Sequence, residues 1–185
     1  MLQLIAIAAP PHAWEIVHRT IVARYGGLAA WLEELRADLV CVHSVILSSI
    51  DHDPSDGDAR YGFASLESSG WDVFLARGRG SSGVAVATFA RRGLTLDADL
   101  ERHGDGVVLT TSHGSWVTIN GQGEGDTFAS SLAQAARRER ARGKRIVVAA
   151  DPRSLAAVDG LVDGVAEMRG KDEAIVVLAQ RLRAR

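Results

Sequence analysis

The sequence predicts an α/β protein built from two packed β-sheets, and three observations carry this prediction. Short apolar runs bounded by proline, glycine or polar residues are typical of buried strands, and apolar residues at helical spacing separate some of them. In the middle of the chain, β-like runs joined by glycine-rich turns are typical of hairpins. A length of 185 residues, of which 46% are hydrophobic and 24% charged, suits one globular domain spanning residues 1–185.

The first third of the chain alternates strands with a helical segment. Residues 2–9 form an apolar run that stops at two prolines, which predicts a buried strand. In residues 14–38 apolar side chains recur at helical spacing, and a Gly-Gly pair interrupts the pattern. Residues 39–47 are a second apolar run and predict a second buried strand. The composition of SSIDHDPSDGDARYG then predicts a long loop.

The middle of the chain has a different pattern. WDVFLAR and GVAVATFAR are β-like runs joined by GRGSSG, while VVLTT and SWVTIN are joined around SHG, and together they predict an antiparallel meander. An amphipathic helix follows, with Asp126 and Thr127 as its predicted cap. Its apolar stripe includes Phe128 and Leu132, opposite the charged run RRERARGK, and Gly143 is its predicted end.

The last third of the chain returns to buried strands. Residues 146–150 are apolar and run into Asp151, which predicts a strand that delivers an acid at its carboxyl end. Residues 155–165 are predicted to be helical, and residues 174–180 form the last predicted strand. The whole chain is thus predicted to hold about eight strands and three or four helices.

Composition narrows the function classes. A net charge of −2 gives no support to strong general binding of nucleic acids, which favours a basic surplus. Cys41 is the single cysteine, so no disulfide can form within the chain and a reducing interior is expected. The N-terminus has no basic region and no apolar run long enough to span a bilayer. We therefore expect a soluble, cytoplasmic protein without a membrane partner.

The order of motifs along the chain adds a further indication. A leading strand and a helix with WLEEL precede ADLVCVHSV and GWDVFLARGRGSSGVAVATFAR, and WVTINGQGEG, a second helix, KRIVVAADPRS and RGKDEAIVVLA follow. This order resembles the exonuclease III type of AP endonuclease, which belongs to the endonuclease/exonuclease/phosphatase superfamily. The resemblance implies a shortened form of that family's DNase-I-like, four-layer α/β/β/α sandwich, in which two mixed sheets are flanked by helices.

The family cleaves phosphodiesters with the help of a divalent metal ion. The resemblance implies that the asparagine closing its first strand falls at Ala8, and that its metal-binding glutamate falls at Ser44. His43 stands where the family has glutamine, and the family's Tyr-x-Pro motif is missing after the run INGQ. Ala8 and Ser44 have therefore lost the ligand chemistry that the family's metal site uses.

Two acids of the family's active site remain. Asp151 keeps the acid of an Asp-x-Asn motif, but Arg153 takes the place of the asparagine. Asp172 keeps the acid of the closing Asp-His pair, but Glu173 replaces the histidine. Magnesium needs several converging oxygen ligands, whereas an aspartate two residues from an arginine suits a salt bridge. The residues therefore predict no tight metal site.

Three hypotheses about function follow. The first is a divergent member of this fold that has lost catalysis, needs no cofactor and acts as a binding or interaction module for an unknown protein or ligand. The second is a divergent phosphodiesterase or nuclease that uses magnesium or manganese with Asp151, Asp172, Glu173 and His43. The third is an unrelated α/β binding protein.

Other polar features have simpler interpretations. The acidic residues 51–58 lack a complete calcium-binding pattern and are predicted to form a solvated loop. GRGSSG with Arg77 and Arg79 is predicted to be a turn, His113 a turn residue, and the arginine cluster 137–145 a solvated helix face. No serine-hydrolase, Walker or zinc-ligand pattern is present in the sequence.

Overall fold

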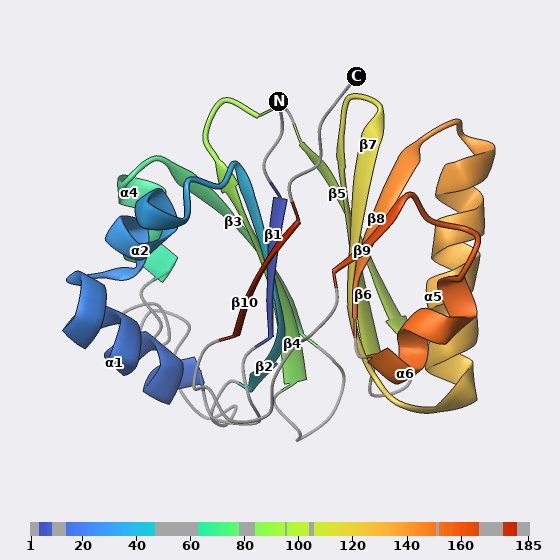
Figure 1. Ribbon diagram of the computed structural model, residues 1–185, viewed down its shortest axis with the longest axis horizontal. Coiled ribbons are helices and arrows are strands. Elements are labelled where there is room, and N and C mark those ends of the chain that lie inside the picture. Colours follow the sequence, from blue (N-terminus) through green and yellow to red (C-terminus); the bar gives the residue numbers. More distant parts are fainter. Residues whose placement is uncertain are drawn as a thin grey trace.

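The computed structural model describes residues 4–8, 14–46, 63–77, 84–94, 96–103, 106–150, 152–166 and 176–180. Two five-stranded sheets pack face to face, and helices cover the outer face of each (Figure 1). The predicted sandwich of two mixed sheets between two helical layers is therefore confirmed.

The first sheet, sheet A, has the strand order β10-β1-β2-β4-β3. β1 is parallel to β2 and antiparallel to β10, while β4 is antiparallel to both β2 and β3. Its strands are Leu4–Ala8 (β1), Leu39–Ile46 (β2), Trp71–Arg77 (β3), Val84–Arg91 (β4) and Val176–Gln180 (β10).

The second sheet, sheet B, has the strand order β5-β6-β7-β8-β9. β5, β6 and β7 are antiparallel neighbours, whereas β7, β8 and β9 are parallel neighbours. Its strands are Asp97–His103 (β5), Gly106–His113 (β6), Trp116–Gln122 (β7), Arg145–Ala149 (β8) and Gly164–Ala166 (β9).

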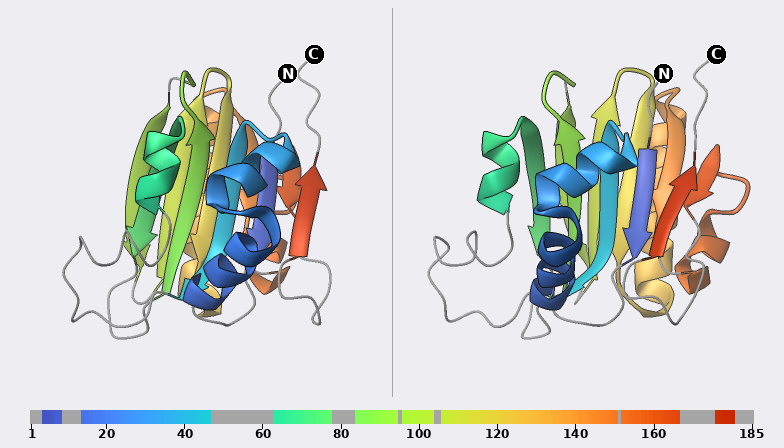
Figure 2. Two further views of the ribbon diagram at one scale, coloured as in Figure 1. Left: turned by 90° about the vertical axis from the view of Figure 1, so that its left-hand side faces the viewer. Right: turned by 60° about the vertical axis from the view of Figure 1, so that its left-hand side comes forward.

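The helices divide between the two outer faces (Figures 1 and 2). Sheet A is covered by α1 (Trp14–Tyr25), α2 (Leu28–Leu35) and α4 (Phe63–Ser68), and sheet B by α5 (Gly125–Ala141), α6 (Pro152–Leu155) and the short 3₁₀ helix Ala156–Val158. The predicted break between α1 and α2 is confirmed, because Gly26 adopts a φ of 82° that side chains disfavour. Among the described helices, none has the length and apolar character to cross a membrane.

The hydrophobic core has three layers. Trp31, Trp71 and Phe89 are buried between sheet A and its helices. Between the two sheets, inward-facing residues of β2, β4, β7 and β8 pack together, and between sheet B and α5 the predicted helical stripe is buried. The interior residues of that stripe are Phe128, Leu132, Ala135 and Ala136.

The predicted four-stranded meander is wrong. β3 and β4 pair in sheet A, whereas β6 and β7 pair in sheet B, so the two hairpin-like pairs face each other across the sandwich. The alternation of apolar residues indicates which neighbours pair. It does not indicate whether two pairs extend one sheet or pack as two, because both arrangements bury the same faces.

Four further points differ from what the sequence predicts. β5 was not predicted as a strand, although Leu96, Ala98 and Leu100 alternate with polar residues as they do in a half-buried edge strand. The segment 155–165, predicted to be helical, contains a 3₁₀ turn and then leads into β9, and α4 was not predicted at all. The cap of α5 is Glu124 rather than Asp126 or Thr127, which lie in its first turn.

Cys41 lies in the layer between the sheets, where its Sγ is 3.8 Å from Oγ1 of Thr88. Burial raises the pKa of the Cys41 thiol to about 12, although the hydrogen bond with Thr88 lowers it. In the unfolded chain the thiol ionises near its ordinary pKa of 9.0. The unfolded state therefore loses its proton first as pH rises, and the stability of the fold decreases between these two pKa values.

We accordingly expect the free energy of unfolding to fall by at most about 1.4 kcal/mol per pH unit above pH 9 because of this thiol. Urea unfolding of the wild type and Cys41→Ala, at about pH 8 and about pH 10, measures the effect as a difference in pH dependence. Equal pH dependence in the two proteins would contradict the expectation.

Candidate functional site

Both sheets bring the carboxyl ends of a parallel strand pair to the same end of the sandwich. β1 and β2 form this pair in sheet A, and β7 and β8 form it in sheet B. Asn120, near the end of β7, donates from Nδ2 to the carbonyl oxygen of Val42 in β2 at 3.2 Å, so the two pairs meet. This end lies at the bottom of Figure 1, beside α6 and the N-terminus of α5. We refer to it as the strand-end site.

The strand register places two predicted positions next to each other. Ala8 pairs with His43 on one side and with Val176, the first residue of β10, on the other. Ser44 follows His43 in β2. The positions to which the resemblance assigns the family's asparagine and glutamate are thus neighbours, and here they provide a methyl group and a hydroxyl.

Three of the predicted catalytic residues, Asp151, Asp172 and Glu173, lie outside the described residues, as do the acidic loop 51–58 and Arg79. The fourth, His43, is described only by its place in β2. The convergence of these four side chains on one site therefore stays a prediction. Their flanking segments do meet, because β8 leads into Asp151 at the end where β10 begins beside β1.

A β-bulge distorts β2 at the strand-end site. Val42 pairs with Ala87 and Val45 with Ala85, so β2 has one residue more than β4 over this stretch. Bulges re-aim side chains, and the bulged residues here are His43 and Ser44. Nδ2 of Asn120 donates to the carbonyl oxygens of Val42, at 3.2 Å, and of Ala87, at 3.0 Å. Asn120 therefore ties the bulge in sheet A to β7 in sheet B.

A pocket of about 160 Å³ opens at the sheet B side of the site. It lies between the end of β7, the start of α5 and α6, and its lining residues are Gln122, Gly123, Glu124, Gly125, Arg153 and Ser154. Ser154 is only 5% exposed, whereas Arg153 and Glu124 are exposed. The pocket thus combines a buried hydroxyl with an exposed positive charge at its rim.

The first turn of α5 is held close to the sheet by a contact between glycines and a phenyl ring. Phe128 lies over Gly106, Gly121 and Gly123, and a Cβ at Gly123 would stand 2.6 Å from Cγ of Phe128 and 3.0 Å from Cα of Gly106. Such distances leave no room for a side chain. The run GQGEG therefore allows the close approach that shapes the pocket.

The pocket carries charges of both signs, because the carboxylate of Glu124 lines it together with the guanidinium of Arg153. The backbone N–H groups at the start of α5 carry a partial positive charge, and the cap residue Glu124 makes no side-chain hydrogen bond to them. Arg153 adds a guanidinium at the rim. Within the described part of the chain, no three histidine, cysteine, aspartate or glutamate side chains gather to hold a metal ion.

Sequence reasoning identified Arg153 but missed Asn120, Ser154 and the pocket. The three alternate glycines of NGQGEG were an available signal, because glycines at such spacing mark close approach of another element. Nothing in the sequence marked Asn120 as a cross-sheet hydrogen-bond donor, since its partners lie 78 and 33 residues away.

Comparisons with known proteins show similarity in structure and not in sequence. No protein-family model matches this sequence, and no curated protein is significantly similar to it. TDP2 from D. rerio, solved with a single-strand DNA product, is 13% identical, with a TM-score of 0.52 over 87% of this chain and 66% of that one.

Two other solved structures are similar to the same degree. The human Nocturnin catalytic domain with a bound sulfate anion is 11% identical, with a TM-score of 0.51 over 81% of this chain and 64% of that one. ANGEL2, a 2',3'-cyclic phosphatase solved with adenosine-2',3'-vanadate, is 11% identical, with a TM-score of 0.51 over 81% of this chain and 53% of that one. This chain thus spans about two thirds or less of each of the three. It has the fold of the endonuclease/exonuclease/phosphatase superfamily.

Proposed function

We propose that this protein is a divergent member of the fold that has lost metal-dependent phosphodiester cleavage and binds a phosphate-bearing ligand at the strand-end site. The observation that carries the proposal is the pocket between β7, α5 and α6, where the start of a 17-residue helix, a buried serine and an arginine meet. Helix N-termini and arginine side chains are both preferred partners of phosphate.

The donor set at the site does not fit the metal that the superfamily resemblance implies. Ala8 has no ligand atom, and Ser44 offers a hydroxyl in place of a carboxylate. Arg153 brings a fixed positive charge to the rim of the pocket, where it opposes a nearby cation and attracts an anion. We infer that the guanidinium provides positive charge for a phosphate without a metal ion.

The solved structures of similar fold support an anionic ligand. Nocturnin holds a sulfate, ANGEL2 an adenosine vanadate and TDP2 a DNA product. Because the net charge of this chain is −2, a short phosphate-bearing ligand fits it better than a long nucleic acid. A buried, unpaired Cys41 fits the reducing cytoplasm in which we place the protein.

A second candidate function is a divergent phosphodiesterase or nuclease. It is favoured by the register of sheet A, since Ala8 lies between His43 and the start of β10, and the segment with Asp172 and Glu173 precedes that start. Asp151 would join them from the end of β8. Magnesium or manganese would be the required cofactor.

Phosphate binding and turnover distinguish the two functions. We expect inorganic phosphate to bind in a calorimetric titration, and Arg153→Gln to weaken it about tenfold, because a charge-assisted hydrogen bond is lost. Arg137→Gln, an exposed arginine of α5 outside the pocket, is the matched control and should leave binding unchanged. If inorganic phosphate bound the wild type and Arg153→Gln with equal affinity, the proposal that this pocket binds phosphate would lose its support.

Catalysis is tested with an abasic-site duplex and a generic phosphodiester in the presence of magnesium or manganese. We expect no turnover, and a lower melting temperature for Asp151→Asn, since that change leaves an arginine without its predicted partner. Turnover by the wild type that vanishes in an Asp151→Asn protein of equal or greater stability would establish the phosphodiesterase instead. Magnesium binding with micromolar affinity that is lost in Asp151→Ala would also favour the phosphodiesterase.

A further inference from the structure

A second pocket, of about 290 Å³, lies on the outer face of sheet B where the edge strand β5 meets the end of α5. Its lining residues include Asp97, Asp99, Thr110, Ser112, Arg142 and Lys144, and we refer to it as the β5–α5 pocket. Asp97 pairs with Ser112 at the carboxyl end of β6. The strand-end site lies at the carboxyl end of the antiparallel β7, so the two sites are at opposite ends of sheet B.

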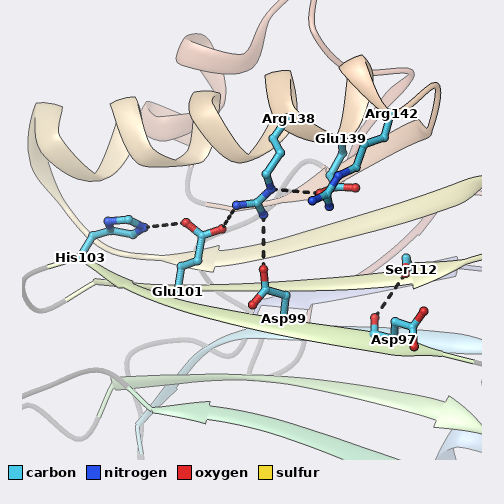
Figure 3. A network of polar contacts seen from close by, with 8 residues as sticks. All are labelled: Asp97, Asp99, Glu101, His103, Ser112, Arg138, Glu139 and Arg142. Carbon is cyan, nitrogen blue, oxygen red and sulfur yellow. Dashed lines mark hydrogen bonds and ion pairs between the residues drawn. The ribbon is translucent and has the colours of Figure 1, made fainter.

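A network of paired charges borders the β5–α5 pocket, and Asp99, Glu139 and Arg142 of this network line it (Figure 3). Arg138 of α5 bonds to Glu101 of β5 and, through Nε at 3.1 Å, to Glu139. Arg142 reaches the same Glu139 oxygen at 2.7 Å. Desolvation lowers the pKa of Arg138, but the hydrogen bonds that it donates to Glu101 and Glu139 raise this pKa above its ordinary value, so the guanidinium stays charged. The arginine cluster, predicted to be solvated, is therefore partly engaged in ion pairs.

Two opposite charges of the pocket remain unbalanced within the described part of the chain. Nζ of Lys144 donates to the carbonyl oxygen of Gly114, which carries no formal charge. Asp97 engages Ser112 through its backbone oxygen, and its carboxylate has no ion pair there. The carboxylate of Asp97 and the ammonium group of Lys144 thus line the same pocket.

A buried hydroxyl that lines the same pocket also lacks a partner. Thr110 is 5% exposed, lines the pocket and pairs in the sheet with Asp99. Its Oγ1 makes no hydrogen bond within the described part of the chain. Buried hydroxyls in native proteins are normally hydrogen-bonded, so an unpartnered one at a pocket indicates a bound group or water.

From this arrangement we propose that the β5–α5 pocket binds a small zwitterion of amino-acid size. The ammonium group of the ligand would lie against Asp97, and its carboxylate against Lys144. Asp99 and Arg142 also line the pocket, but Asp99 already pairs with Arg138, at 3.7 Å, and Arg142 with Glu139. The hydroxyl of Thr110 would complete the hydrogen bonds of the ligand. Each charge of the ligand then compensates an opposite charge of the protein. A simple cation would be repelled by the positive group of the pocket, and a simple anion by the negative group. This site is separate from the proposed phosphate site and does not depend on it.

Three probes that differ by one group test the proposal. L-serine carries both charges, ethanolamine lacks the carboxylate, and 3-hydroxypropionate lacks the ammonium. In NMR titrations of the full chain, we expect L-serine to shift the amide resonances of Thr110 and Ser112, with a dissociation constant in the millimolar range because the pocket is open to solvent. The two single-charge probes should bind about tenfold more weakly or not at all.

Variants of residues that line the β5–α5 pocket test whether L-serine binds there. Asp97→Asn and Lys144→Gln should each weaken L-serine binding about tenfold, whereas Asp159→Asn, an exposed acid outside the pocket, should not change it. All three positions are at the surface, so the variants are expected to fold. No resonance shift with L-serine, or equal binding of L-serine and either single-charge probe, would overturn the proposal. Phosphate binding at the strand-end site is unaffected by any of these outcomes.

Discussion

Replacing Asn120 with aspartate is expected to destabilise the protein by about 3–5 kcal/mol at neutral pH, the cost of an uncompensated buried charge. Asn120 is 0% exposed, and its Nδ2 donates to two carbonyl oxygens of sheet A. A carboxylate there has no donor and faces both carbonyls. The change therefore removes two hydrogen bonds across the sheets and adds electrostatic repulsion in a dry environment.

Lowering the pH should restore part of the stability that the Asn120→Asp variant loses. Burial raises the pKa of the introduced carboxyl above its unfolded value of about 3.9, so the folded state binds the proton more tightly. The destabilisation is then full at neutral pH and decreases as pH falls, because the protonated acid can donate one hydrogen bond. Urea unfolding at neutral pH and at about pH 4, compared with wild type at each pH, measures both effects.

Gln134→Glu is the matched control, since it makes the same chemical change at an exposed position of α5. It should alter the free energy of unfolding by no more than about 0.5 kcal/mol at either pH. If N120D were as stable as Q134E at neutral pH, the cross-sheet hydrogen bonds of Asn120 would not contribute to the fold as the structure indicates.

Substituting Gly123 with alanine should cost about 1–3 kcal/mol, the usual penalty for overpacking a well-packed position. The new Cβ would stand 2.6 Å from Cγ of Phe128 and 3.0 Å from Cα of Gly106. The first turn of α5 must move away from the sheet to accommodate it. Because that turn lines the strand-end pocket, we also expect weaker binding of inorganic phosphate.

A double-mutant cycle with Phe128→Leu isolates this contact. The smaller side chain makes room for the methyl group, so the double variant should be less destabilised than the sum of the single variants. Gly121→Ala should cost less than Gly123→Ala, since its Cβ would stand 3.1 Å from Cζ of Phe128 and 3.2 Å from Cδ1 of Leu132, at the ends of side chains that can shift. Strict additivity of the two changes would contradict the described close approach.

Part of the candidate site was accessible from the sequence. The predicted runs 2–9 and 39–47 contain the strands β1 and β2, and the motif order drew attention to Ala8 and Ser44 near their ends. The register adds that Ala8 lies beside His43. The pocket was not accessible in this way. It depends on how closely α5 approaches the sheet, which is decided by a ring and three glycines that meet only after β6, β7 and α5 have assembled.

The sequence by itself determined most of the strands, the helices α1, α2 and α5, and the buried stripe of α5. The run from Leu39 was predicted because a short continuous apolar segment is typical of a strand buried on both faces, and the stripe of α5 because burial follows a period of 3.6 in a helix. Each pattern is contained within a few neighbouring residues, so tertiary structure is not needed to recognise it.

Only the tertiary structure decided how these segments combine. It assigned the two hairpin-like pairs to different sheets, joined Asn120 to a carbonyl 78 residues away and paired Arg138 with Glu101 across 37 residues. It also placed β5 at the edge of sheet B, beside β6. These outcomes depend on contacts between residues far apart in the chain, for which local periodicity carries no information.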